Sequence, residues 1–180
     1  ELDQKKSKLN VSYGRSSGYL NIYDLEDYPD LPIKDVQLCC QINQNLLKQA
    51  LRKTVFAAAT NHFRQIFTGV LFDYKDNHRL NIVASDTHRL ARFCCMLEGD
   101  NLEPFNFIIP IRTVNELLRL LEDSDRPINI GISSNNVIFY QENFTLFSRL
   151  IDGQYPNYEA VIPTNFITEF NIDPRILATS

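Results

Sequence analysis

The sequence predicts an α+β fold in which two helices pack on antiparallel β-sheet. Three observations support this prediction. Many short segments are rich in branched and aromatic residues and are bounded by turn-forming residues, which is typical of strands. Two longer stretches instead place apolar residues at helical spacing. The resulting order, strand, helix, strands, helix, strands, favours helices gathered on one face of the sheet.

The first helix is predicted over residues 44–59, after a strand at residues 36–42. Asn43 precedes it, and its side chain can accept a hydrogen bond from an unpaired backbone N–H group. One side of the helix is apolar and consists of Leu47, Ala50, Leu51, Thr54, Val55 and Ala58. The opposite side is polar, contains no acid and carries Lys48, Gln49, Arg52 and Lys53. Such a side is either an ordinary solvated surface or one that faces phosphate groups.

Short strands separated by turns follow this helix, and we predict them over residues 68–74, 79–85, 89–97 and 105–110. The second helix has an apolar stripe formed by Val114, Leu117, Leu118 and Leu121. Arg112 and Arg119 lie off that stripe, beside Glu116 and Glu122. Three further strands are predicted over residues 128–132, 136–141 and 144–151.

Composition sets broad limits on the class of protein. A chain of 180 residues with 44% hydrophobic residues can bury one good core and parts of others. No stretch resembles a membrane span or a secretory leader. The formal net charge of −4 gives no overall basic signature for a nucleic-acid partner. A local basic face can still act within an acidic whole.

The four cysteines occur as two adjacent pairs, Cys39–Cys40 and Cys94–Cys95. Neighbouring residues on a strand point to opposite faces, so we expect each pair to have one inward and one outward thiol. The pairs lack the spacing of a zinc site. We therefore expect reduced thiols, with neither metal nor disulfide.

A repeat indicates the domain organisation. Residues 9–32 and 135–163 each contain two strands, a turn and a Tyr-Pro block, at Tyr28-Pro29 and Tyr155-Pro156. A strand and a capped helix start follow each block, and Pro174 occupies a first helical position, where proline is favoured. We therefore expect the end of one domain at 1–35, a complete domain at 36–163 and the start of a third at 164–180. The chain would then be a piece of a longer protein.

Five blocks carry a resemblance to a known family: TGVLFD at Thr68–Asp73, VASDTHRLAR at Val83–Arg92, IIPIRTVNELLRLL at Ile108–Leu121, ISSNNVIF at Ile132–Phe139 and RLIDGQYPNYEAVIP at Arg149–Pro163. With these blocks in this order, the sequence resembles the bacterial sliding clamps, the beta subunits of DNA polymerase III. The resemblance implies a DNA-clamp fold with three similar domains per chain. Two chains would join head to tail as a homodimeric ring around duplex DNA, and residues 36–163 would form the middle domain.

The resemblance also implies a function. The protein would be a cytoplasmic DNA polymerase processivity factor that is not itself an enzyme and needs no cofactor. It would encircle double-stranded DNA without sequence specificity. Its protein partners would be the catalytic subunit of the replicative polymerase, the clamp loader and other proteins with a clamp-binding motif.

In this family a surface pocket accepts a short apolar peptide motif, and the matching positions here are Phe67, Thr87, His88, Arg89, Leu90, Pro156, Ala160 and Val161. Three of them depart from the family pattern. Thr87 replaces the usual glycine, Phe67 a smaller aliphatic residue, and Ala160 a position where an arginine can occur. In the family the third domain supplies part of this pocket, so we expect residues 1–180 alone to bind such peptides weakly.

The first predicted helix matches a helix that lines the central hole of the clamp. The resemblance thus implies that its cations, Lys48, Arg52 and Lys53, face DNA. Arg112 and Arg119 on the second helix, and Asn61, Arg64 and Gln65 in a loop, are further DNA-facing candidates. Such contacts would go to phosphates and would carry no sequence information.

The sequence leaves two other functions open. A hydrolase could use Ser85, Asp86 and His88, but alternate side chains near a strand turn diverge, and catalytic triads draw on distant segments. A clamp-like module could bind peptides and never bind DNA. A metal site is not expected, because the histidines, His62, His78 and His88, lack partners at ligand spacing.

Overall fold

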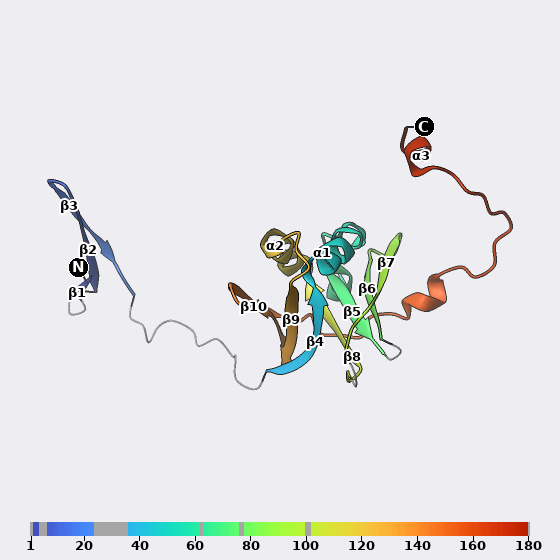
Figure 1. The fold of residues 1–180 in the computed structure, drawn as a ribbon, viewed down its shortest axis with the longest axis horizontal. Helices are drawn as coiled ribbons and strands as arrows, with labels where there is room; N and C mark the ends of the chain where they lie inside the picture. Colours follow the sequence, from blue (N-terminus) through green and yellow to red (C-terminus); the bar gives the residue numbers. More distant parts are fainter. Residues whose placement is uncertain are drawn as a thin grey trace. The chain divides into compact units, whose positions relative to one another are not determined.

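The computed structural model describes residues 2–3, 7–23, 36–61, 63–75, 78–99 and 102–179. The chain divides into two compact units, Glu1–Lys34 and Asp35–Ser180 (Figure 1). The first unit contains an antiparallel sheet in the order β1-β2-β3, formed by Leu2–Asp3, Lys8–Tyr13 and Ser16–Asn21. The two longer strands were predicted from the sequence. The first Tyr-Pro block, Tyr28-Pro29, lies outside the described residues.

The second unit contains two four-stranded antiparallel sheets, ordered β11-β10-β9-β4 and β7-β6-β5-β8. The strands are β4 (Gln37–Asn43), β5 (Gly69–Tyr74), β6 (Arg79–Ser85), β7 (Leu90–Met96), β8 (Phe105–Pro110), β9 (Pro127–Ser133), β10 (Asn136–Gln141) and β11 (Phe144–Arg149). The helices α1 (Gln44–Arg52) and α2 (Ile111–Leu120) lie on the same side of the sheets (Figure 1). The predicted α+β class is therefore confirmed.

The second unit repeats an order of elements, strand, helix and three strands, and the two halves exchange their first strands. The first strand of one half, β4, pairs with β9, so that Asn43 lies opposite Pro127. The first strand of the other half, β8, pairs with β5, so that Pro110 lies opposite Gly69. Each helix follows its exchanged strand directly. This symmetry could not be predicted from the sequence, because it lies in the strand pairing and in no shared motif.

The main core draws on both sheets and both helices. Phe72 of β5 stacks on Phe107 of β8, with ring centroids 5.1 Å apart, and its ring lies 6.2 Å from that of Phe139 in the other sheet. The apolar side of α1 enters the same core, where Leu47 and Leu51 are fully buried. Each such side chain contributes about 1.5–3 kcal/mol through burial. This core fixes the positions of both helices relative to the strands.

The first helix ends at Arg52, so its predicted extent to residue 59 is wrong. Thr54 is buried, and its hydroxyl donates to the carbonyl oxygen of Ala50 at 2.8 Å while its backbone leaves the helical conformation. Threonine side chains compete with the helix ladder in this way. A short 3₁₀ turn, Val55–Ala57, follows. Thr54 and Ala58 are nevertheless buried, as the apolar pattern predicted.

The predicted placement of one inward and one outward cysteine in each pair is confirmed. Cys40 and Cys95 are buried, Cys94 is exposed and Cys39 is half-buried, and all four are free thiols. Burial raises the pKa of Cys40 to about 12 and that of Cys95 to about 11. A bulge between Leu38 and Cys40 interrupts the pairing of β4 with β9. These buried thiols are neutral members of the core.

The chain after β11 contains the 3₁₀ turn Tyr158–Val161 and the exposed helix α3 (Pro174–Thr179), the capped helix start predicted from the sequence. Asp173 accepts a hydrogen bond from the backbone N–H of Arg175 at 2.9 Å. Within the described residues, we find no helix whose length and apolar character would suit a membrane span.

Candidate functional site

The turn between β6 and β7 is built by two polar side chains. The Asp86 carboxylate accepts hydrogen bonds from the backbone N–H groups of His88 and Arg89, at 3.0 and 2.9 Å, and from Arg89 Nε at 2.9 Å. The Ser85 hydroxyl donates to the carbonyl oxygen of Arg89 at 2.8 Å and accepts from the N–H of Thr87 at 3.1 Å. The backbone N–H of Arg89, with that of His88, lowers the pKa of Asp86. The turn is thus held by its own side chains.

These contacts argue against a hydrolase at this turn. A nucleophilic serine needs a base that takes its proton, yet the Ser85 proton goes to a backbone carbonyl. The orienting carboxylate would have to bond the histidine ring, whereas Asp86 bonds backbone N–H groups and the Arg89 guanidinium. Ser85 and Asp86 are turn-forming residues.

Thr87 adopts a backbone conformation that side chains rarely allow. Its φ is +78°, in the left-handed region, and it is one of the few described residues other than glycine with a positive φ. A β-branched residue is strained there by about 1–2 kcal/mol, whereas glycine is not. Thr87, which stands where the family pattern usually has glycine, therefore places strain in this turn.

A cavity of about 510 Å³ lies beside this turn. Seven of the eight predicted pocket residues line it: Phe67, Thr87, His88, Arg89, Leu90, Pro156 and Val161. The eighth, Ala160, is exposed beside Val161 and is not part of the lining. The lining also includes residues that sequence analysis did not assign to the pocket: Arg64, Ser85, Tyr155, Asn157 and Tyr158. Tyr155 and Tyr158 could have been expected there, because they are the aromatic residues of the YPNY block at 155–158.

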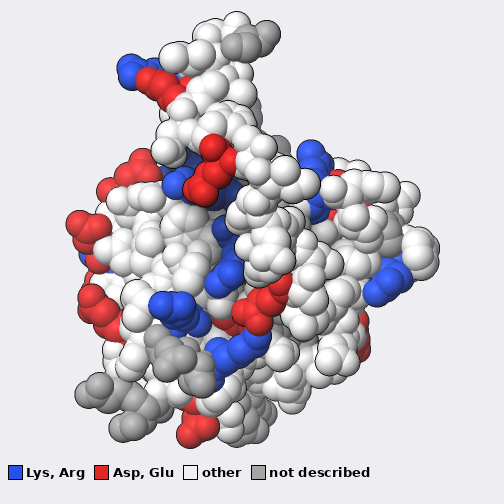
Figure 2. Space-filling model, turned by 90° about the vertical axis from the view of Figure 1, so that its right-hand side faces the viewer, with Lys and Arg blue, Asp and Glu red and all other residues white. Residues whose placement is uncertain are grey.

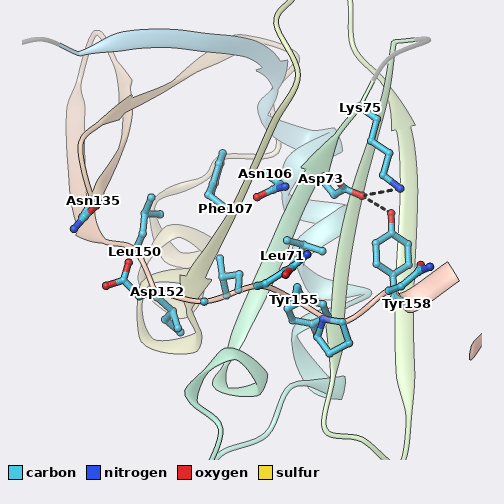
Figure 3. A pocket seen from close by; sticks show the side chains of 16 residues that line it. Leu71, Asp73, Lys75, Asn106, Phe107, Asn135, Leu150, Asp152, Tyr155 and Tyr158 are labelled. Carbon is cyan, nitrogen blue, oxygen red and sulfur yellow. Dashed lines mark hydrogen bonds and ion pairs between the residues drawn. The ribbon is translucent and has the colours of Figure 1, made fainter. Parts of the chain in front are cut away.

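One wall of the cavity belongs to residues 150–162, here called the strap. The strap packs on the face of the β7-β6-β5-β8 sheet opposite to the main core, where Tyr158 joins Leu71, Val83 and Ile108 in a second apolar cluster. The backbone N–H of Ile151 donates to the carbonyl oxygen of Ile108 at 2.9 Å. Figure 3 shows the strap crossing these strands.

An aromatic contact joins the strap to the loop that contains Phe67, and a cation lies beside it. The Tyr155 ring of the strap meets the Phe67 ring edge to face, with centroids 5.9 Å apart. The Arg64 guanidinium lies 5.0 Å from the centroid of the same Phe67 ring. Burial raises the pKa of Tyr155 to about 12, so its hydroxyl stays neutral. Arg64, predicted to face DNA, thus lies at the cavity.

The chemistry of the cavity suits a peptide with apolar side chains. Its interior offers Phe67, Leu90, Pro156 and Val161, and its cationic or polar edge offers Arg64, His88 and Arg89. Among the described residues that line it, none is an aspartate or a glutamate. Sites for extended peptides combine apolar pockets with a few orienting polar groups in this way. If such a peptide carries an acidic residue beside its apolar residues, the cationic edge of the cavity would attract it.

The cations of the helices differ in their surroundings. Arg52, Lys53, Arg112 and Arg119 are exposed. Arg119 pairs with Glu116 at 3.0 Å, and the Lys53 ammonium lies 5.5 Å from the centroid of the Phe93 ring. Figure 2 shows one face of the molecule, where Lys and Arg side chains lie around a hollow together with Asp and Glu side chains.

Lys48 lies elsewhere, and its predicted place on the solvated side of α1 is wrong. Only 8% of the residue is exposed, and its ammonium bonds Asp123 Oδ1 at 2.8 Å. That hydrogen bond lowers the pKa of Asp123. The segment after α2 reaches over the start of α1, where the buried Gln44 side chain accepts from the N–H of Glu122 at 3.2 Å. Lys48 therefore joins α1 to this segment.

The remaining candidates lie near the turn or on the surface. Asn61 and Gln65 are exposed, and Asn61 lines a cavity of about 310 Å³ together with Asp86, Thr87, His88 and Arg89. His78 is exposed, and His62 lies outside the described residues. Within the part of the chain that the structure describes, no cluster of three His, Cys, Asp or Glu residues could hold a metal ion.

Comparisons with known proteins agree on one family. Residues 41–157 match the family described as the DNA polymerase III beta subunit, central domain. The chain is 35% identical over 165 residues to the beta sliding clamp of Bacillus subtilis (strain 168), covering 92% of this chain and 43% of that protein. It thus spans less than half the length of this relative.

Solved structures give the same result. The sliding clamp of Bacillus subtilis matches with a TM-score of 0.82 and 34% identity, covering 90% of this chain and 42% of that one. A sliding clamp of Pseudomonas aeruginosa bound to griselimycin matches with a TM-score of 0.79 and 30% identity, covering 88% of this chain and 43% of that one.

Proposed function

The chain belongs to the family of the DNA polymerase III beta subunit, and on that premise we propose that it is part of a ring-shaped sliding clamp. The ring encircles duplex DNA and tethers the replicative polymerase, without catalysing a reaction itself. Residues 36–163 form the complete middle domain, 1–35 the last strands of the first domain and 164–180 the start of the third. The start of the second compact unit at Asp35 supports the first boundary, and the family match at 41–157 supports the extent of the middle domain.

The observation that carries the proposal is the cavity of about 510 Å³, because three separate segments of the chain assemble it. The loop with Phe67, the turn with Leu90 and the strap with Pro156 meet there. We assign to this cavity the short apolar motifs of the polymerase catalytic subunit, the clamp loader and other clamp-binding proteins. The griselimycin-bound clamp of Pseudomonas aeruginosa supports a search for ligands of this kind.

The DNA-facing surface is assigned to the exposed cations of α1 and α2, with Arg52 and Arg112 as its leading members because neither makes an ion pair within the described part of the chain. Contacts with phosphates are sensitive to salt and nearly independent of sequence, as sliding requires. Retention then comes from the closed ring, formed by two chains head to tail in the cytoplasm. A net charge of −4 is compatible with this arrangement.

The peptide assignment is tested by calorimetric titration of griselimycin into the complete protein that carries this domain. Leu90→Ala with Pro156→Ala truncates two walls of the cavity. We expect the affinity to fall by about tenfold or more, equivalent to about 1.4 kcal/mol. Met96→Ala is the matched control, since Met96 is exposed and does not line the cavity. Equal affinity of the double variant and the wild type would contradict the assignment.

The DNA assignment is tested by loading the protein on nicked circular DNA and measuring its retention at increasing salt. Arg52→Glu with Arg112→Glu replaces attraction to phosphates by repulsion, so we expect a shorter retention time. Glu103→Lys, at another exposed position, serves as the control. If the wild type binds griselimycin but is never retained on DNA, the protein is a peptide-binding module without DNA binding.

A further inference from the structure

We infer that Asp73, Lys75 and Tyr158 form a lock that holds the strap in position and thereby shapes the peptide cavity. The inference rests on the proposed function of that cavity and concerns how its wall is held: Tyr158 lines the cavity, whereas Asp73 and Lys75 do not. Asp73 is the last residue of β5 on the face of the sheet that the strap covers. Lys75 follows the end of β5, and Tyr158 belongs to the strap. Tyr158 lies 85 positions after Asp73 in the sequence.

The lock is centred on a buried carboxylate. The Tyr158 hydroxyl donates to Asp73 Oδ2 at 2.7 Å, and the Lys75 ammonium lies 3.7 Å from the same oxygen (Figure 3). Asp73 is 6% exposed and Tyr158 5% exposed. The Lys75 ammonium also bonds Glu159 Oε2 at 3.2 Å, so it bridges a carboxylate of the strand and one of the strap.

A carboxylate is an unusual residue at this position. Strand β5 is buried throughout, with Phe72 and Tyr74 in the main core and Leu71 in the cluster under the strap. Another apolar residue at position 73 would fit that pattern, and burying a carboxylate is unfavourable unless it is paired and hydrogen-bonded. Burial, together with the hydrogen bond to Asp73, raises the pKa of Tyr158, so the phenol remains a donor to the carboxylate.

The hydrogen bond in the lock is directional, whereas the apolar contacts of the strap are not. Ile151, Tyr155 and Ile162 pack on the sheet through apolar contacts, which have no fixed direction. The backbone hydrogen bond from Ile151 to Ile108 holds the start of the strap, seven positions before Tyr158. A hydrogen bond between fixed atoms fixes one register, a use of buried polar groups known from other folds. Pro156 and Val161, two wall residues of the cavity, lie two and three positions from Tyr158. A strap held at Tyr158 therefore holds both walls.

Asp73 and Lys75 act only through the strap. They line a second cavity of about 390 Å³ on the other side of it, and neither lines the peptide cavity. Tyr158 lines both. Asp73 and Lys75 are therefore positioning residues, and their removal lowers the fraction of molecules with a formed wall. Because only molecules with a formed wall bind the ligand, the apparent affinity falls in proportion to their fraction. The association rate falls, while the dissociation rate stays constant.

The test measures association and dissociation rates of griselimycin with the complete protein by surface plasmon resonance. Tyr158→Phe removes one hydroxyl, and Asp73→Leu removes the acceptor. We expect each to lower the association rate by roughly three- to tenfold, in keeping with the loss of one hydrogen bond. The double variant is expected to lose no more than either single variant, because both break the same contact. Asp73→Asn, which keeps an acceptor oxygen, is expected to restore binding to within about twofold.

Tyr140→Phe is the matched control, because it removes a phenol from β10, away from both cavities. Tyr158→Phe keeps the ring and so decides the case if Asp73→Leu fails to fold. Wild-type rates in both Tyr158→Phe and Asp73→Leu, with loss of binding in Leu90→Ala, would overturn the lock and leave the proposed function intact. A faster dissociation at an unchanged association rate would also overturn it, since that identifies a direct contact. A wild type that binds no griselimycin overturns both.

Discussion

The surroundings of the peptide cavity and the face of the two helices use polar side chains in opposite ways. Around the cavity, Ser85 and Asp86 bond Arg89 of their own turn, and Tyr158 bonds Asp73 of β5. On the helices, Arg52 and Arg112 extend from the surface without an ion pair among the described residues. A cavity depends on geometry, so single changes have large effects there. A charged face depends on a sum of small contributions.

The largest effect is expected for a substitution of Gly69 in β5, because a side chain there would collide with the strap and with β8. A Cβ at Gly69 would lie 2.5 Å from Ile108 Cγ2, 2.7 Å from the carbonyl oxygen of Ile109 and 2.8 Å from Ile151 Cδ1 of the strap. Overpacking of this kind destabilises a fold by about 1–3 kcal/mol. We therefore expect Gly69→Ala to lower both the free energy of unfolding in urea and the affinity for griselimycin.

Gly131→Ala separates these two effects of Gly69→Ala. Its Cβ would lie 2.5 Å from Val36 Cγ1 and 3.2 Å from the carbonyl oxygen of Gln37, in the other sheet. The fold is then destabilised by the same mechanism, but the strap is not displaced. The affinity is measured under conditions in which both variants are folded. Equal losses of griselimycin affinity would show that the affinity depends on the overall stability of the fold and not on the geometry of the cavity.

A smaller effect distinguishes two cations of α1. Lys48 is nearly buried against Asp123, so Lys48→Glu places a carboxylate beside another carboxylate. We expect the free energy of unfolding to fall by about 1–2 kcal/mol, less than for a fully buried pair because Asp123 is 76% exposed. Arg52→Glu, on an exposed residue, is expected to change stability by no more than about 0.5 kcal/mol. Urea unfolding of the two variants tests this contrast, and equal losses would contradict the tethered role of Lys48.

The same residues show what the sequence could predict. Strand positions, the second helix and the inward cysteines follow from local periodicity, because burial on one face repeats along the chain. The end of α1 at Arg52 and the pairing of Lys48 with Asp123 depend on contacts outside that periodicity. The cavity walls were assigned through the resemblance, whereas the bond from Tyr158 to Asp73 joins residues 85 positions apart and left no local pattern.

The smallest effect concerns the strained turn at the mouth of the cavity. Thr87 has a φ of +78°, which glycine adopts without strain. Relief of that strain exceeds the extra freedom that glycine gives the unfolded chain, so Thr87→Gly is expected to raise the free energy of unfolding by about 0.5–1 kcal/mol. Urea unfolding measures the change, with Thr145→Gly on the exposed face of β11 as a control that is expected to destabilise. Since Thr87 lines both the 510 Å³ and the 310 Å³ cavities, griselimycin affinity should change in the same variant although the fold is more stable. If Thr87→Gly instead lowers the free energy of unfolding, the threonine side chain stabilises the turn. The rim of the cavity would then be no more strained than the face of the two helices.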